Sequence, residues 1–254
     1  MKTAAKILTA GLLLAACFWT APGLAENEGV LPQIARANDL YLNKKYRQAA
    51  DIYEHLVNGG FENGYLYYNL GNTYFRLHRP GQAILNYTRA KKLVPRFEDL
   101  DANLRYAVRQ TEDKILATPT PFPKNILFWL DDFSPREYAL AILAVNGLFW
   151  LTLMAWLYFR TNALGVARSV LLAVLLVTAI SAGARFYTDS RYPAGVVLAK
   201  QIDVKSAQGA DNVTLFQLHE GAGVTIRDEE EGWYKIELGD GKKGWAPKNA
   251  VGKG

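Results

Sequence analysis

Cysteine is nearly absent from this 254-residue chain, in which Cys17 is the only one. No disulfide can therefore form within the chain, so its stability has to come from packing or from partners. Histidine is also scarce: His55, His78 and His219 fall in separate segments, without the spacing of metal ligands. The sequence indicates no metal site and no cofactor.

A dominant sign of charge is also missing, because the net charge of +5 is spread along the chain. Nucleic-acid binding, which needs a coherent basic patch, is therefore not indicated. No nucleophile, base and orienting group can be assembled, so we predict that the protein is not an enzyme. The acidic run Asp228–Glu231 is typical of a solvated loop. Gly239, Gly241 and Gly244 match a nucleotide-site pattern, but no strand-to-helix turn follows them.

Apolar residues make up 50% of the chain and gather in three places. The first is the run 7–19, which follows two lysines and precedes small residues at 23–25. This layout is typical of an export signal, and we predict a signal peptide over residues 1–25. An alternative stays open, because residues 14–17 also resemble the bacterial lipobox, in which Cys17 becomes the lipid-bearing residue.

The other two apolar runs predict transmembrane helices. Residues 138–159 carry no charge and are long enough, at about 1.5 Å per residue, to cross a hydrocarbon layer of about 30 Å. Residues 134–137, "SPRE", form a capping box with proline at the first helical position, which predicts the helix start. The second span covers residues 169–187, with a flanking arginine able to snorkel. Neither run has the polar stripe of a helix in a soluble core.

Charge asymmetry predicts the orientation of this helical pair. The connecting loop, residues 160–168, has two arginines and no acid, whereas Asp131, Asp132 and Glu137 precede the first span. Since positive loops stay in the cytoplasm, both flanks are expected outside. Together with the export signal, this predicts a bacterial inner-membrane protein whose N-terminal and C-terminal parts lie in the periplasm.

Residues 26–116 contain an internal repeat. Gly64 is taken as position 1 of the repeat. Small residues at positions 8, 20 and 27 let two antiparallel helices pack closely, and large residues at positions 4, 11 and 24 fill the gaps between them. The pattern residues are Tyr67, Leu70, Gly71, Tyr74, Ala83, Tyr87, Ala90 and Pro95. They resemble the 34-residue tetratricopeptide repeat. A weaker copy precedes this one and a solvated helix begins near Glu98, so we expect an all-α solenoid of about two and a half repeats.

The tetratricopeptide resemblance implies a concave groove lined by the first helix of each repeat. It places in the groove Asn38, Tyr41, Tyr68, Asn69, Asn72, Arg76, Tyr106 and Arg109. By this resemblance, the asparagines would hold a peptide backbone, and arginine would meet a carboxylate of an extended segment or chain terminus. The other interpretation stays open, in which tyrosines at helical spacing serve packing.

Residues 117–137 are predicted to connect the repeats to the membrane. The stretch 117–124, "ATPTPFPK", contains three prolines and favours an extended linker. Residues 125–133 then include Trp129, a residue type that suits the membrane interface. We therefore expect this second stretch to lie along the membrane surface.

The tail, residues 195–254, is predicted to be β-rich, with strands at 196–200, 213–218, 223–227 and 233–238. It resembles the bacterial SH3-like domain in its motifs, which are Leu218-His219-Glu220-Gly221, Trp233-Tyr234-Lys235-Ile236, Asp240-Gly241 and Gly244-Trp245. The resemblance implies a small all-β barrel. We expect Trp233, Tyr234 and Trp245 on its surface, where they either support a folded adaptor surface or contact peptide or cell wall.

The chain is predicted to contain, in order, a signal peptide, tetratricopeptide repeats, two membrane spans and an SH3-like tail. This order resembles that of one member type of the Bacteroides-aerotolerance (Bat) family. This resemblance covers nearly the whole chain. It implies a non-catalytic scaffold that joins von Willebrand A-domain membrane proteins and an associated MoxR-type ATPase in an envelope complex linked to stress or oxygen tolerance. The alternative is a membrane protein that binds or senses peptidoglycan. Overall, we predict a multidomain membrane protein.

Overall fold

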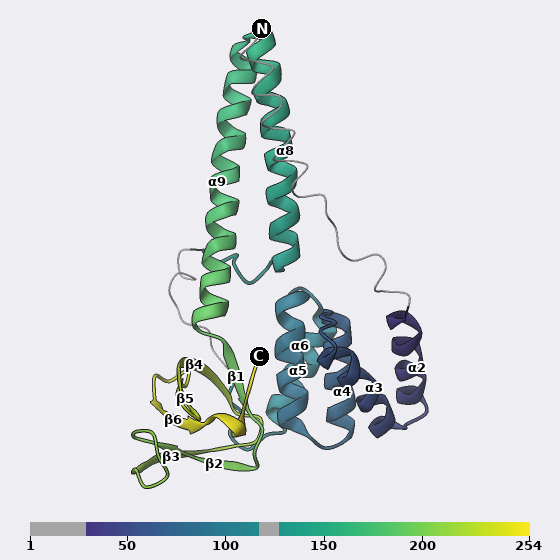
Figure 1. Cartoon of the computed structure of the whole chain (residues 1–254), viewed down its shortest axis with the longest axis vertical. Helices are drawn as coiled ribbons and strands as arrows, with labels where there is room; N and C mark the ends of the chain where they lie inside the picture. Colours follow the sequence, from purple (N-terminus) through teal and green to yellow (C-terminus); the bar gives the residue numbers. More distant parts are fainter. Residues whose placement is uncertain (1–28, 117–126) are drawn as a thin grey trace.

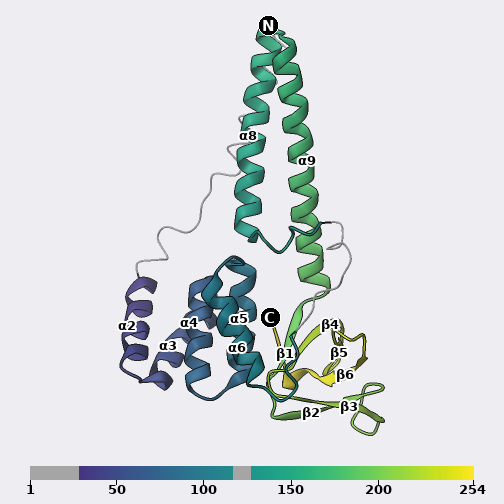
Figure 2. The same ribbon diagram turned by 180° about the vertical axis from the view of Figure 1, so that it is seen from behind.

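The structure, a computed structural model, describes residues 29–116 and 127–254. The predicted signal peptide, the lipobox with Cys17 and the proline-containing linker lie outside these residues. Figure 1 shows a stack of helices, a long helical hairpin and a β-sheet unit. The stack and the sheet unit lie together at one end of the hairpin, as the reverse view in Figure 2 also shows.

The helical stack accounts for the first described stretch. Its helices are α2 (Val30–Leu42), α3 (Tyr46–Asn58), α4 (Gly64–Arg76), α5 (Pro80–Leu93) and α6 (Glu98–Arg109). The α4–α5 pair packs as the spacing of small residues predicts. A Cβ atom on Gly71 would lie 2.6 Å from the ring of Tyr87, while Ala83 and Ala90 are fully buried. The predicted helical N-terminal part is confirmed.

The long hairpin consists of α8 (Pro135–Phe159) and α9 (Asn162–Arg191). Within the described residues, these are the helices long and apolar enough to cross a membrane. The predicted capping box is confirmed. The backbone N–H of Glu137 donates to Ser134 Oγ (3.3 Å), and the backbone N–H of Ser134 donates to Glu137 Oε2 (2.8 Å).

Both hairpin helices are longer than the apolar runs that predicted them. Residues 162–168, expected in the loop, belong to α9, so only Arg160 and Thr161 separate the helices. An uncharged run shows which residues can lie in the hydrocarbon layer. The length of a helix is set instead by where the backbone leaves the helical conformation. That break comes at Arg160, whose φ of 54° is left-handed and ends α8.

In the described part of the chain, seven strands form one antiparallel sheet in the order β3-β2-β6-β5-β4-β1-β7. They are β1 (Ala194–Val197), β2 (Gln201–Lys205), β3 (Thr214–His219), β4 (Gly223–Glu230), β5 (Trp233–Glu237), β6 (Lys243–Pro247) and β7 (Val251–Lys253), with a 3₁₀ turn at Lys248–Ala250. Its core includes Val204, Val224, Ile236 and Ala246, all 0% exposed. The predicted all-β C-terminal part is confirmed.

Strand β2 is absent from the strands that the sequence predicted. The expected strand at 196–200 is wrong in its C-terminal half, because β1 ends at Val197 and the chain turns before β2. Ile202 and Val204 are buried in β2 while Gln201 and Asp203 are exposed. This alternation is the ordinary signal of a half-buried strand, although the run is short.

The turn between β3 and β4 joins the sheet unit to the helical stack. The backbone N–H of Gly81, at the start of α5, donates to Glu220 Oε1 (3.0 Å). The backbone N–H of His219 donates to Asp113 Oδ2 (2.6 Å), and its Nδ1 lies 3.0 Å from Oδ1 of the same carboxylate. Hydrogen bonding to Asp113 raises the pKa of His219, which favours its cationic form at this contact.

Candidate functional site

Two adjoining cavities, of about 290 and 590 Å³, lie in the helical stack and share Phe75, Arg76 and Tyr106. We call them together the groove. Helices α4, α5 and α6 supply most of the lining, with one residue each from α2 and α3. The lining residues are Tyr41, Tyr46, Asn72, Phe75, Arg76, His78, Pro80, Tyr87, Asn103, Tyr106 and Gln110. Four of these, Tyr41, Asn72, Arg76 and Tyr106, are among the residues that the sequence places in a groove.

Asn72 lies where three helices meet in the groove. Its Oδ1 accepts hydrogen bonds from the Tyr87 hydroxyl (2.7 Å) and from Asn103 Nδ2 (2.9 Å). Burial raises the pKa of Tyr87, so that its phenol stays protonated and can donate. Because both contacts use the oxygen of Asn72, its amide N–H groups remain as donors for a bound molecule.

Arg76 is the cation of the groove and is exposed at its edge. Hydrogen bonding to the Tyr41 side chain raises the pKa of Arg76 above its ordinary value, so the guanidinium stays charged. Among the described residues, no carboxylate forms an ion pair with it, and the titratable groups that act on its pKa are the phenols of Tyr41, Tyr46 and Tyr87. Next to it, Phe75 and Tyr106 pack edge to face, with ring centroids 5.6 Å apart. This combination suits an anionic group carried by a partly apolar ligand.

The other predicted groove residues have different positions. Asn38 Oδ1 accepts from the Tyr53 hydroxyl (2.6 Å) and from Asn69 Nδ2 (3.1 Å), so both asparagines tie α2, α3 and α4 together. Tyr68 accepts from Asn103 Nδ2 at 3.0 Å. These three residues support the wall, and Arg109 is exposed outside the two cavities.

Tyr46 and Gln110 line the groove although the repeat pattern does not mark them. Tyr46 starts α3, the second helix of its pair, and Gln110 caps the end of α6. The groove positions that the resemblance implies lie on the first helix of each repeat and do not include the start of a second helix or a helix end. The aromatic character of Tyr46, with its ring 5.3 Å from that of Tyr41, was the available signal.

Trp233 and Trp245 lie half-buried on one face of the sheet, on neighbouring strands β5 and β6. Lys235 directly opposes Trp245 in the register, with its Nζ 5.7 Å from the centroid of that ring. Tyr234 points to the other face and is 5% exposed, as part of the sheet core. The prediction that Tyr234 lies on the surface is therefore wrong, because side chains alternate along a strand.

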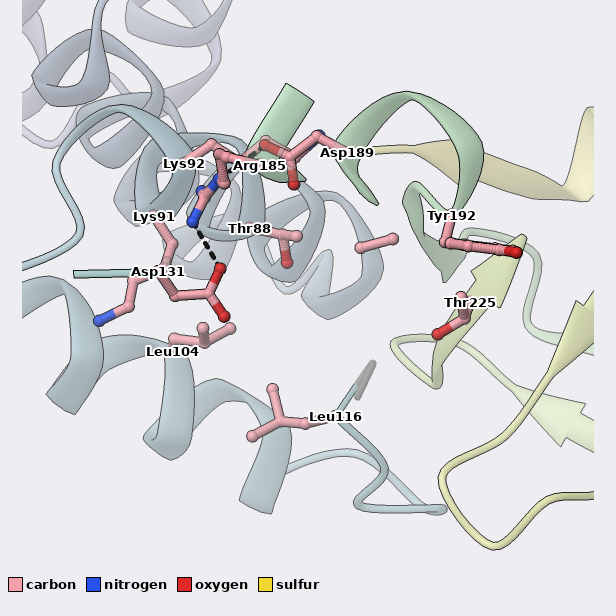
Figure 3. Close-up of a pocket in the computed structure, with 11 residues that line it drawn as sticks. Thr88, Lys91, Lys92, Leu104, Leu116, Asp131, Arg185, Asp189, Tyr192 and Thr225 are labelled. Atoms are coloured by element: carbon pink, nitrogen blue, oxygen red, sulfur yellow. Dashed lines mark hydrogen bonds and ion pairs between the residues drawn. The ribbon is translucent and has the colours of Figure 1, made fainter. Parts of the chain in front are cut away.

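A further cavity, of about 250 Å³, lies where α5 and α6 meet the end of α9 and the sheet (Figure 3). Arg185 is its most buried cation, with 6% of its side chain exposed. It donates to the Leu130 carbonyl oxygen (2.9 Å), to Asp131 and to Asp189 Oδ2 (2.8 Å). This network connects α9 to the segment that precedes α8.

The lysines of this cavity also have partners. Lys91 Nζ pairs with Asp101 Oδ1 at 2.5 Å. Lys92 Nζ donates to the Gly254 carbonyl oxygen (3.0 Å), and burial lowers its pKa. Since these cations are already engaged, we interpret the cavity as part of a structural junction, and the groove is the stronger candidate site.

Comparison with known proteins finds no family model and no curated protein that matches the chain.

Proposed function

We propose that this protein is a non-catalytic, membrane-anchored scaffold of the bacterial envelope. In this proposal the helical stack is a tetratricopeptide domain, the sheet unit is an SH3-like domain, and α8 and α9 span the inner membrane with both domains in the periplasm. The proposed partners are von Willebrand A-domain membrane proteins of a Bat-type complex linked to stress or oxygen tolerance.

The observation that supports this function best is the groove with its charged arginine. Arg76 has tyrosines as its neighbours and pairs with no acid among the described residues. Asn72 offers amide donors beside it, and Phe75 offers an apolar wall. An extended partner segment with a carboxylate would complete these interactions without an enzymatic step.

A charge reversal in the groove tests this proposal. We expect Arg76→Glu to reduce co-purification of an A-domain membrane protein with the detergent-solubilised full chain at least tenfold, or about 1.4 kcal/mol. The reason is that a partner carboxylate would then face a like charge. The measurement is quantitative mass spectrometry after affinity purification.

Arg105→Glu provides the matched control, because Arg105 is exposed on α6 and does not line the groove. It changes the net charge equally and should leave the partner bound. Equal recovery of the A-domain protein with the Arg76 variant and the wild-type chain would contradict the proposal.

A second function, peptidoglycan binding, is favoured by the shared face of Trp233 and Trp245. Half-buried indoles can stack on sugar rings or peptide stems. For this function we expect the full chain in detergent to sediment with purified cell wall, and Trp245→Ala to reduce the bound fraction about fivefold, consistent with roughly 1 kcal/mol per aromatic contact. Sedimentation unchanged by the variant, with the fold intact by circular dichroism, would exclude this surface.

A further inference from the structure

The turn of the long hairpin holds two arginines against one tryptophan. The Cζ atom of Arg160 lies 5.0 Å, and that of Arg168 4.3 Å, from the ring centroid of Trp156. This tip is the part of the hairpin farthest from the sheet unit (Figure 1). Cations stacked on an indole are favourably placed, but the contact does not neutralise either charge.

Nothing in the hairpin balances these two charges. The sequence contains no acidic residue between Glu137 and Asp189. Arg160 Nε donates to the Leu157 carbonyl oxygen (3.2 Å), which leaves the rest of its guanidinium for other acceptors. These two like charges can therefore pair with an anion from outside the hairpin.

The backbone keeps this arrangement in place. Arg160 has a left-handed φ of 54°, and its N–H donates to the Trp156 carbonyl oxygen (2.9 Å). Gly165 packs so tightly on the indole that a Cβ atom would lie 3.2 Å from Trp156 Nε1. The site is thus built by both helices and does not depend on two freely moving side chains.

We propose that the hairpin tip binds the phosphate of an anionic phospholipid headgroup through Arg160 and Arg168. Guanidinium groups bind phosphate oxygens in a bidentate manner, and tryptophan suits the headgroup region. Exposed apolar side chains at the same end of the hairpin, Phe159 and Val166, offer a surface for acyl chains that a free phosphate would not use. The inference rests on the proposed function in one respect, the membrane crossing of α8 and α9.

The test measures lipid binding to the full chain in detergent by native mass spectrometry. Phosphatidylglycerol and phosphatidylcholine with identical acyl chains are the two probes. We expect the wild-type chain to prefer phosphatidylglycerol. The R160Q/R168Q variant should bind this lipid about tenfold to thirtyfold more weakly, because each basic residue contributes about 1 kcal/mol to binding at an anionic lipid surface. Binding of phosphatidylcholine should not change.

Arg191→Gln is the control, because Arg191 lies at the opposite end of α9 and is exposed. It should keep the preference for phosphatidylglycerol. Equal binding of both lipids by the wild-type chain would overturn the proposal, and so would an unchanged preference in the double variant. Complete displacement of phosphatidylglycerol by inorganic phosphate at equal concentration would show that the site binds a free anion. This result would also overturn the proposal.

Two further measurements separate the possible failures. Retention of phosphatidylcholine binding and of helical circular dichroism shows that the double variant is folded. Extraction of the wild-type chain from vesicles at alkaline pH would contradict the membrane crossing itself. A chain that resists this extraction but shows no headgroup preference would contradict only the site at the tip.

Discussion

We expect the Gly221→Ala variant of the full chain to lose about 3 kcal/mol of stability, measured by denaturant unfolding in detergent. Gly221 has a φ of +89°, which strains any residue with a Cβ atom. Its Cβ atom would also lie 2.4 Å from Thr111 Cγ2 and 3.0 Å from Ile84 Cδ1. Ile84 lies in α5 and Thr111 follows the end of α6, so the variant should also expose the junction to protease.

Gly241→Ala separates the two causes of this loss. Gly241 has nearly the same φ, +87°, but no atom lies within 4 Å of the position of its Cβ atom. We expect this variant to lose only about 1 kcal/mol, from backbone strain alone. Equal losses in the two variants would show that the turn after β3 does not pack against the stack as described.

A comparable loss, about 3 to 5 kcal/mol, is expected for Arg185→Ala. The variant removes the buried cation that binds the Leu130 carbonyl oxygen, Asp131 and Asp189, and leaves carboxylates without this partner. Chemical denaturation in detergent measures the stability. Exposure of Trp129, whose Nε1 donates to Ser181 Oγ at 3.1 Å, would appear as a shift in indole fluorescence.

Neutralising the partners provides the control for this second variant. A triple change of Arg185→Leu, Asp131→Asn and Asp189→Asn should recover part of the lost stability, because the two carboxylates that Arg185 binds are then neutral. Arg191→Ala, at an exposed position on the same helix, should cost less than about 1 kcal/mol. If Arg191→Ala and Arg185→Ala lost equal stability, the contacts of Arg185 with Asp131 and Asp189 would not stabilise the fold more than an exposed arginine does.

Local pattern predicts the helices well, because their determinants are neighbours in sequence. The capping box at Ser134 acts within one helix, and Gly71 allows Tyr87 of the adjacent helix to pack closely. Both are confirmed. Strand β2 was missed because the predicted strand at 196–200 was continued across the turn that follows Val197, which left no separate run for Gln201–Lys205. Tyr234 was misplaced because a family motif names residues without stating which face each one occupies.

Long-range placement could not be predicted from the sequence. Asn38 and Asn72 have the same residue type and equivalent places in the repeat, yet one supports the wall and the other lines the groove. Both accept hydrogen bonds from a tyrosine hydroxyl and an asparagine at equivalent spacings, so the difference between them is the cavity that lies beside Asn72. The contact between Glu220 and Gly81 joins residues 139 positions apart, for which no local pattern exists.

Only Tyr192 and Pro193 separate the end of α9 from β1. A helix of 30 residues, about 45 Å long, therefore passes almost directly into the sheet, which in turn is bonded to α5. If α8 and α9 span the bilayer as proposed, this short connection sets the height of the groove above the lipid surface. A partner on a long flexible tether would bind a groove at any height about equally well. A partner that is itself held rigidly by a membrane helix would be positioned at the height of the groove before it binds.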